Sequence, residues 1–168
     1  MLTLESLSPH LALHLKTVRL RALQDSPTAF GRTYAEESQL SDADWLNRVA
    51  VRTSDDASMC CLAMDGGEPC GIIAGYLDSI HPPKPYVASM WVAPTHRNTG
   101  LGAKLMNEVQ QWAQHLGAGE LHLMVTSSNA RAIRFYERCG FTFTGTTGPY
   151  PNDPALFEYE MIKPLQNS

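Results

Sequence analysis

Long apolar runs are missing from this 168-residue sequence, and no stretch approaches the roughly 20 apolar residues of a membrane-spanning helix. The first five residues, Met1 to Glu5, also lack the basic start and apolar stretch of a secretory signal peptide. Basic residues are in the minority, since 13 Lys and Arg stand against 17 Asp and Glu, for a net charge of −4. This charge disfavours nucleic acid and anionic membranes as partners.

Cysteine is scarce, and it shows neither a Cys-x-x-Cys pair nor a metal-ligand spacing at its positions Cys60, Cys61, Cys70 and Cys139. We interpret these residues as reduced thiols that pack as small hydrophobic side chains, which is typical of a cytoplasmic protein. His10 and His14 stand one helical turn apart, but without a third ligand nearby they indicate a helix face rather than a metal site. The sequence therefore predicts a cytoplasmic protein without a metal ion.

The composition is that of a folded domain, with 43% hydrophobic and 18% charged residues. With no internal repeat and no linker, the sequence predicts one α/β domain with a mixed sheet over residues 1–168. The segment Phe30–Glu37 fits no pattern. Apolar spacing and capping residues predict helices at Pro9–Asp25, from Ser41 past Val49, at Leu101–Leu116 and at Asn129–Cys139. Short apolar or alternating runs predict strands at Met59–Met64, Gly71–Leu77, Tyr86–Val92, Leu121–Val125, Phe141–Thr146 and Phe157–Ile162.

The most informative segment runs from Val92 to Leu105, where a strand ends, a turn with two glycines follows and a long helix begins. Free backbone N–H groups at the helix start, together with the helix dipole, favour an anion. Gly100 and Gly102 have no side chain to obstruct a phosphate, and Arg97 adds a guanidinium that can bind phosphate oxygens. The segment lacks the Gly-Lys-Ser/Thr of a P-loop and the third glycine of a Rossmann turn, so it predicts a phosphate site of another kind.

Two sequence patterns carry a resemblance to a known family. Arg97-Asn98-Thr99-Gly100-Leu101-Gly102 matches Arg/Gln-x-x-Gly-x-Gly/Ala in full, and Asn129 to Phe141 is similar to Asn-x-x-Ala-x-x-Phe/Leu-Tyr-x-x-x-Gly-Phe. In this order, the two patterns resemble those of the GNAT superfamily of N-acetyltransferases. The resemblance is good from Tyr86 to Ile162 and rests on element order alone before residue 86. It implies a single-domain GNAT-like α/β fold, with a mixed central sheet of about six to seven strands flanked by helices. It also implies an acetyl-CoA-binding core at residues 86–147.

The resemblance further implies where acetyl-CoA binds. The pyrophosphate would lie over the backbone amides of Arg97 to Ala103, and the pantetheine arm along the exposed edge of the strand Tyr86–Val92. The backbone N–H of Val92 would polarise the thioester carbonyl, and one such donor can contribute ~3 kcal/mol. Asn129 would reach the pantetheine and could also cap its helix. The predicted cofactor-binding residues are Trp91, Val92, Arg97, Asn98, Thr99, Gly100, Leu101, Gly102, Ala103, Asn129 and Tyr136.

Tyr136 is the predicted catalytic residue. The departing CoA thiolate needs a proton, and a phenol of similar intrinsic acidity is a suitable donor. The alternative is a tyrosine that only packs its ring beside Ile133. Cys139 could suggest a covalent acetyl intermediate, but it has no evident base nearby, so we expect an inert thiol and direct transfer.

The acceptor amine must be neutral to attack the thioester, so a base or a water chain is required. The sequence leaves this role open among Glu36, Glu37, Ser89, His122 and a chain of water molecules. We expect the two glutamates to lie on a solvated loop and the histidine to be a core or surface residue.

The prediction is an acetyl-CoA-dependent N-acetyltransferase, an acyltransferase that acts directly on a primary amine. A small-molecule acceptor is slightly favoured, because aromatic and proline-rich loops around Phe30, Tyr34, Tyr150 and Pro151 suggest an enclosed pocket. One alternative is a protein N-terminal or lysine acetyltransferase. Another is a non-catalytic acyl-CoA-binding regulator, which would be expected to lose Tyr136 or the glycines of the signature. The acyl-chain preference and the oligomeric state, with a homodimer as one option, stay open.

Overall fold

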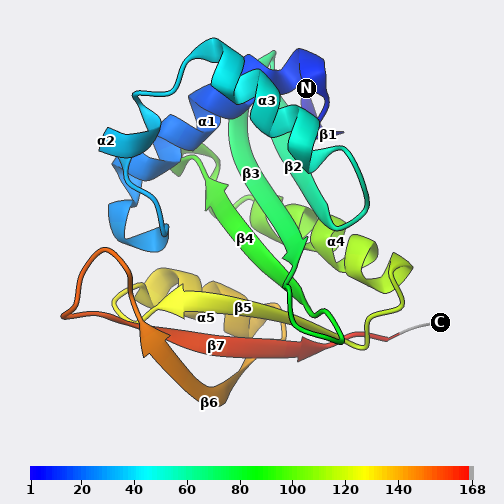
Figure 1. Cartoon of the computed structure of the whole chain (residues 1–168), viewed down its shortest axis with the longest axis vertical. Coiled ribbons are helices and arrows are strands. Elements are labelled where there is room, and N and C mark those ends of the chain that lie inside the picture. Colours follow the sequence, from blue (N-terminus) through cyan, green and yellow to red (C-terminus); the bar gives the residue numbers. More distant parts are fainter. Residues whose placement is uncertain (167–168) are drawn as a thin grey trace.

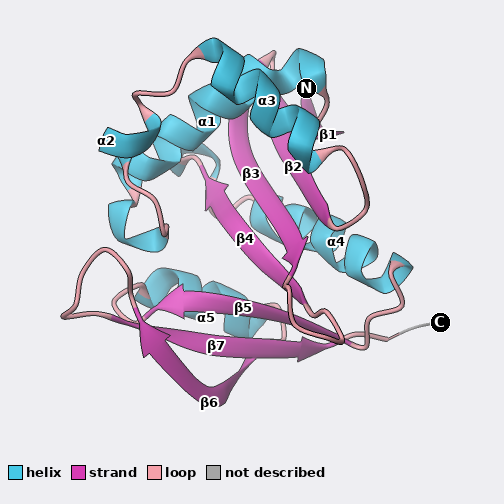
Figure 2. Ribbon diagram, in the orientation of Figure 1, coloured by secondary structure: helices cyan, strands magenta, loops and turns pink. Residues whose placement is uncertain are grey.

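One seven-stranded mixed sheet forms the centre of the structure, a computed structural model that describes residues 1–166. The strands are β1 (Leu2–Ser6), β2 (Ser58–Asp65), β3 (Glu68–Leu77), β4 (Pro85–Val92), β5 (Glu120–Thr126), β6 (Thr142–Pro149) and β7 (Phe157–Pro164). Their order in the sheet is β1-β2-β3-β4-β5-β7-β6 (Figures 1 and 2). All neighbours are antiparallel except β4 and β5, which are parallel. The predicted α/β fold with a mixed sheet is confirmed.

Helices cover the sheet on both faces. They are α1 (Ala12–Asp25), α2 (Tyr34–Glu37), α3 (Asp42–Arg52), α4 (Leu101–His115) and α5 (Ala130–Arg138), with 3-10 turns at Pro9–Leu11, Pro27–Ala29 and Pro94–His96. α4 packs closely on β3, because a Cβ at Gly75 would come within 2.8 Å of Val109 in that helix. Since successive strand residues point to opposite faces, the neighbours of Gly75 face away from α4. α1 also packs on β3, and it covers this other face together with α3.

Most of the predicted elements are present, and local capping explains two of their boundaries. α3 begins with a capping box, in which the Ser41 hydroxyl accepts from the Asp44 N–H (3.1 Å) and the Asp44 carboxylate accepts from the Ser41 N–H (2.9 Å). Gly117 follows α4 with a φ of 80°, the left-handed conformation of a helix-ending glycine. None of the helices in residues 1–166 is long and apolar enough to cross a membrane.

Two elements differ from the prediction. β1 was not predicted from the sequence; it is a short edge strand without fully buried residues, which pairs with β2. α2 lies in the segment Phe30–Glu37 that fitted no pattern, and its single turn begins where the Thr33 hydroxyl accepts from the Glu36 N–H. α2 is too short for an apolar period to develop. β1 does alternate at Leu2 and Leu4, but this brief alternation at the start of the chain was not interpreted as a strand.

The two halves of the sheet meet along a very short ladder. β4 and β5 pair only at Tyr86–His122 and Val87–Leu123 and then separate, as Figure 1 shows. β4 also contains a bulge around Ser89, which has a φ of 54°, and the register with β3 shifts there. From Ala88 onward, the edge of β4 that faces β5 has no strand partner.

Candidate functional site

A cleft of about 1100 Å³ lies at the separation of β4 and β5. Its walls come from the end of β4, the turn before α4, the first turn of α4 and the helix α5. The predicted cofactor-binding residues that line it are Trp91, Val92, Arg97, Asn98, Gly100, Gly102, Ala103, Asn129 and Tyr136. The other two lie elsewhere. The Thr99 hydroxyl donates to the His96 carbonyl oxygen (2.6 Å), and Leu101 is buried in the core. The fold thus brings most of the predicted residues to one cleft.

The start of α4 depends on both glycines, for different reasons. Gly100 is the N-cap residue with a φ of 86°, and no side chain caps the helix, so the first backbone N–H groups lack intrahelical partners. A Cβ at Gly100 would meet no atom within 4 Å, so the left-handed φ explains this glycine. At Gly102, a Cβ would lie 3.0 Å from Cε1 of Phe135. Gly102 therefore allows α4 and α5 to approach each other, a role that sequence reasoning missed.

Asp25, at the end of α1, accepts three hydrogen bonds beside the cleft. Its Oδ2 accepts from the Trp91 indole N–H (2.9 Å), from the Ser26 hydroxyl (2.9 Å) and from the Arg97 guanidinium. Burial raises the pKa of Asp25, but these hydrogen bonds outweigh it, so the pKa lies below the ordinary value. Arg97 also donates through Nε to the Val92 carbonyl oxygen (2.9 Å). The structure thus directs much of the Arg97 guanidinium to protein groups, and its contact with a phosphate stays a prediction.

Three further arginines line the cleft from α5, and sequence reasoning did not identify them. They are Arg131, Arg134 and Arg138, at intervals of three and four residues that place them on one side of the helix. Their side chains are exposed, and none has an ion-pair partner among residues 1–166. Their helical spacing beside the second family pattern is the signal that could have found them. Together they give the cleft a positive wall that suits a polyanion.

Tyr136 lies in the same cleft and is mostly buried, with 8% of its surface exposed. Its ring contacts Phe135 and Phe141, with centroid distances of 5.6 and 5.9 Å. Its hydroxyl makes no hydrogen bond with a described residue. Burial raises the pKa of Tyr136 above that of an ordinary phenol, so the group stays protonated near neutral pH. A protonated phenol without a partner, at the wall of a cleft, is free to donate to a ligand.

Asn129 and Cys139 stand at the two ends of α5. The Asn129 Oδ1 accepts from the Ala132 N–H (3.3 Å), so this residue caps the helix while it also lines the cleft. Burial raises the pKa of the Cys139 thiol, although Lys163 and Arg138 oppose the shift. A raised pKa lowers the fraction of reactive thiolate, and the inert role of Cys139 stays a prediction.

The prediction that Glu37 lies on a solvated loop is wrong. Its side chain is 1% exposed and bridges two guanidinium groups, with Oε1 2.8 Å from Arg19 Nε and Oε2 2.8 Å from Arg48 Nη1. Burial raises the pKa of Glu37, but the two arginines more than offset it and leave the pKa lowered. Arg19 also donates to the Ser89 hydroxyl (2.9 Å), so this ion pair fixes the bulge of β4. A carboxylate held in this way is a weak base, whereas its neighbour Glu36 is exposed on α2.

His122 is buried on β5, so of the two positions expected for it, core or surface, the structure shows the core. It is 4% exposed, and its ring lies 5.2 Å from that of Tyr86. Its Nε2 is 3.6 Å from a Glu120 carboxylate oxygen, and its Nδ1 has no hydrogen-bond partner among the described residues. The choice of a general base among Glu36, Ser89, His122 and a water chain stays open.

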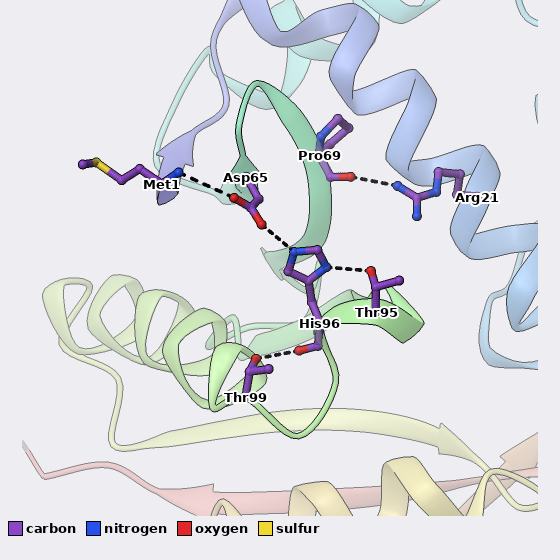
Figure 3. A network of polar contacts seen from close by, with 7 residues as sticks. All are labelled: Met1, Arg21, Asp65, Pro69, Thr95, His96 and Thr99. Atoms are coloured by element: carbon purple, nitrogen blue, oxygen red, sulfur yellow. Dashed lines mark hydrogen bonds and ion pairs between the residues drawn. The ribbon is translucent and has the colours of Figure 1, made fainter.

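A polar network connects the turn before α4 with the β2–β3 hairpin (Figure 3). This turn carries the pattern Arg97–Gly102 and is called the signature turn below. The Asp65 carboxylate lies 2.8 Å from His96 Nε2 and 3.7 Å from the Met1 amino group. The Thr95 hydroxyl is 2.8 Å from His96 Nδ1. These contacts fix the residue directly before Arg97, so they help to position the turn.

The loop between β6 and β7 packs against the segment that follows α1. The buried Tyr150 hydroxyl donates to the carbonyl oxygens of Phe30 (2.6 Å) and Pro27 (3.2 Å). The Asn152 amide donates to the same Phe30 oxygen (3.2 Å). Two of the aromatic residues expected around an acceptor pocket, Phe30 and Tyr150, therefore join these two loops in the structure.

Comparison with known proteins places this geometry in a family. The model of the acetyltransferase (GNAT) family matches residues 19–141. Streptothricin acetyltransferase of Streptomyces lavendulae is 50% identical over 67 residues, which cover 40% of this chain and 32% of that protein. The chain spans about a third to six tenths of the lengths of the first curated relatives that it matches.

Solved structures show the same fold. An acetyltransferase of the GNAT family from Streptococcus pneumoniae superposes with a TM-score of 0.83 at 22% identity, over 99% of this chain and 100% of that one. The PaiA N-acetyltransferase of Thermoplasma acidophilum, solved in complex with coenzyme A, superposes with a TM-score of 0.74 at 18% identity, over 98% and 99%. Because the family model matches most of the chain, including the signature turn, the chain belongs to the acetyltransferase (GNAT) family.

Proposed function

We propose that this protein is an acetyl-CoA-dependent N-acetyltransferase that transfers the acetyl group directly to a primary amine of a small molecule. The observation that carries the proposal is the cleft of about 1100 Å³ at the separation of β4 and β5. The signature turn, the arginines of α5 and the phenol of Tyr136 all line it. Residues 86–147 form the acetyl-CoA-binding core of a single domain in this proposal.

Acetyl-CoA binds through its phosphates and its pantetheine arm. The pyrophosphate lies over the backbone N–H groups from Arg97 to Ala103, at the positive end of the α4 dipole. Arg131, Arg134 and Arg138 supply the charge that its remaining phosphate requires, and their exposure leaves them free to reach it. The extended pantetheine pairs with the unpartnered edge of β4 from Ala88 to Val92.

The alternation of hydrogen bonds along β4 supports the role of Val92. The Ala93 N–H donates to the Cys70 carbonyl oxygen on β3 (2.8 Å). Because neighbouring N–H groups in a strand point in opposite directions, the N–H of Val92 faces the separation from β5. There it donates to the thioester carbonyl oxygen, whose negative charge grows as the amine attacks.

The transfer needs one bond to form and one to break. The neutral amine nitrogen attacks the carbonyl carbon, the carbon–sulfur bond breaks, and the CoA thiolate takes the proton of the Tyr136 hydroxyl. The amine loses a proton to a base or to water, and solvent restores the proton of Tyr136. Transfer is direct in this proposal, because the Cys139 thiol has no hydrogen-bonded base among residues 1–166 and burial raises its pKa.

A small-molecule acceptor is in line with the streptothricin acetyltransferase relative, whose name gives streptothricin as what it acetylates. The four cysteines of the chain are free thiols, which fits a reaction in the cytoplasm. A homodimer stays a prediction, which sedimentation of the purified protein would test.

Two measurements test the proposal. Calorimetry should show that acetyl-CoA binds, and that acetyl-CoA without its 3′-phosphate binds more weakly to the wild type. Arg134→Gln should reduce this difference, because the variant removes part of the positive wall. Thiol release should then accelerate with at least one member of a primary-amine panel. Absence of acetyl-CoA binding, or thiol release that no amine accelerates, would contradict the function.

A further inference from the structure

A second group of polar residues lies on the sheet face opposite α4 and outside the cleft. We call it the acidic face and define it by Tyr76, Asp78, Tyr86, His122, Glu158 and Glu160. Gly75 lies against α4, so the next residue, Tyr76, points to the other side of the sheet. Tyr76 pairs with Tyr86, and Tyr86 with His122, so their side chains share this face.

Direct contacts hold this group together. The rings of Tyr76 and Tyr86 are stacked, with centroids 5.6 Å apart and an interplanar angle of 16°. The Tyr86 ring lies 5.2 Å from the ring of His122, and its hydroxyl donates to Glu160 Oε2 (3.1 Å). The group is therefore an ordered aromatic and carboxylate surface built from four strands.

The carboxylates of this face lack counter-charges. Asp78, Glu158 and Glu160 form no ion pair with any of the residues that the structure describes. Burial raises the pKa of Glu158, and no neighbouring cation opposes that shift. Burial, followed by the hydrogen bond and charge of Glu160, raises the pKa of Tyr86 to about 12.

An independent observation on the same face is the unsatisfied nitrogen of His122. The ring is 4% exposed, it contacts Tyr86, and its Nδ1 has no partner in the described part of the chain. Buried polar groups normally find a hydrogen-bond partner. Together with the unpaired carboxylates, this nitrogen indicates that a polar ligand completes the site.

The position of the face connects it with the cleft. Tyr86 and His122 form one of the two residue pairs between β4 and β5, and the strands separate immediately beyond them. The cofactor cleft lies on the side of α4 and α5, whereas the acidic face lies on the other side. A thioester in the separation is thus accessible to an amine that approaches over Tyr86.

We propose that the acidic face binds a protonated amino group of the acceptor, so that the acceptor is a small molecule with at least two amino groups. One amine is neutral and attacks the thioester, and the other stays an ammonium held by Glu158 and Glu160. The stacked tyrosines offer a π surface to the same charge. This inference rests on the proposed acetyl transfer and identifies the class of its acceptor.

The test compares cadaverine with n-pentylamine, which has the same carbon chain but only one amino group. Wild-type kcat/KM should favour cadaverine by at least about tenfold. The double variant Glu158→Gln/Glu160→Gln should lose most of this preference through a higher KM for cadaverine, with the KM for acetyl-CoA unchanged. Glu68→Gln, an exposed change in the β2–β3 hairpin, is the matched control and should behave as wild type. An equal preference in wild type and double variant would overturn the inference.

Direct binding separates this inference from the function on which it rests. If the wild type acetylates neither amine, the proposed transfer to amines fails, but calorimetry with cadaverine still tests the face. Binding that is lost in the folded double variant, as judged by thermal denaturation, supports the inference. Absence of cadaverine binding to wild type in the presence of acetyl-CoA refutes it.

Discussion

Replacement of Glu37 by glutamine should destabilise the fold rather than remove a catalytic base. The carboxylate lies between Arg19 and Arg48, and it is 1% exposed. Glutamine keeps the shape and one acceptor oxygen, which can still receive the Arg19 Nε donor. The amide NH₂ then faces a guanidinium N–H, so two donors meet where an ion pair stood.

The loss of stability depends on which of the two arginines can turn its side chain toward water. The Arg48 side chain is 21% exposed and can turn toward water, whereas that of Arg19 is 10% exposed and also bonds to Ser89. Removal of one partner from a buried pair typically costs about 3 to 5 kcal/mol. Because glutamine preserves one acceptor, we expect the low end, ~3 kcal/mol. For a chain of this length that corresponds to a Tm lower by roughly 10 °C.

The assay is thermal and urea denaturation of Glu37→Gln beside Glu36→Gln, an exposed neighbour that should stay within ~0.5 kcal/mol of wild type. The lowered pKa of Glu37 also fixes the pH dependence, because the native state favours the ionised form. The wild-type advantage should be complete above the unfolded pKa and disappear as the pH falls through the folded one. A Glu37→Gln protein as stable as wild type but inactive would refute this reasoning and indicate a base.

Three further changes address the cleft. Tyr136→Phe should lower kcat by ~10²–10⁴-fold while Tm and acetyl-CoA affinity stay near wild type, because only the proton donor is lost; a loss below about fivefold would contradict the assignment. Gly100→Val should weaken acetyl-CoA binding in calorimetry at least tenfold (~1.4 kcal/mol), since a β-branched residue resists the φ of 86°, whereas Gly100→Asn should retain more affinity. Cys139→Ser should leave kcat nearly unchanged, and mass spectrometry after exposure to acetyl-CoA alone should find no acetyl on Cys139 that is competent for onward transfer.

Features encoded by neighbouring residues could be predicted from the sequence. The capping box of Ser41 and Asp44, the glycine after α4 and the β2–β3 hairpin each depend on a few consecutive residues. The position of the cleft could also be predicted, because most of the residues that line it lie in the two continuous patterns Arg97–Gly102 and Asn129–Phe141. Local chemistry and family pattern agree there, and nine of the eleven predicted cofactor-binding residues line the cleft.

Features that depend on distant partners could not be predicted. Glu37 resembles a surface residue in its own segment, and its burial follows from Arg19, which lies 18 residues earlier. The acidic face draws on four strands, with Tyr86 bonded to a carboxylate 74 residues later. Gly102 lies against Phe135 only because two helices meet. Each of these requires the register of the sheet or a helix crossing, which residue spacing does not contain.

The separation of β4 and β5 leaves a hydrogen-bond ladder incomplete inside a folded protein. An extended molecule with amide groups of its own can occupy the place of the missing strand, and the proposed pantetheine arm is such a molecule. Bound acetyl-CoA would then complete the hydrogen-bond ladder between β4 and β5. The gap would open again each time the CoA product leaves. Protection of the Val92 amide from hydrogen exchange should therefore rise with acetyl-CoA and fall when the product leaves, so that exchange at one backbone group reports the progress of the catalytic cycle.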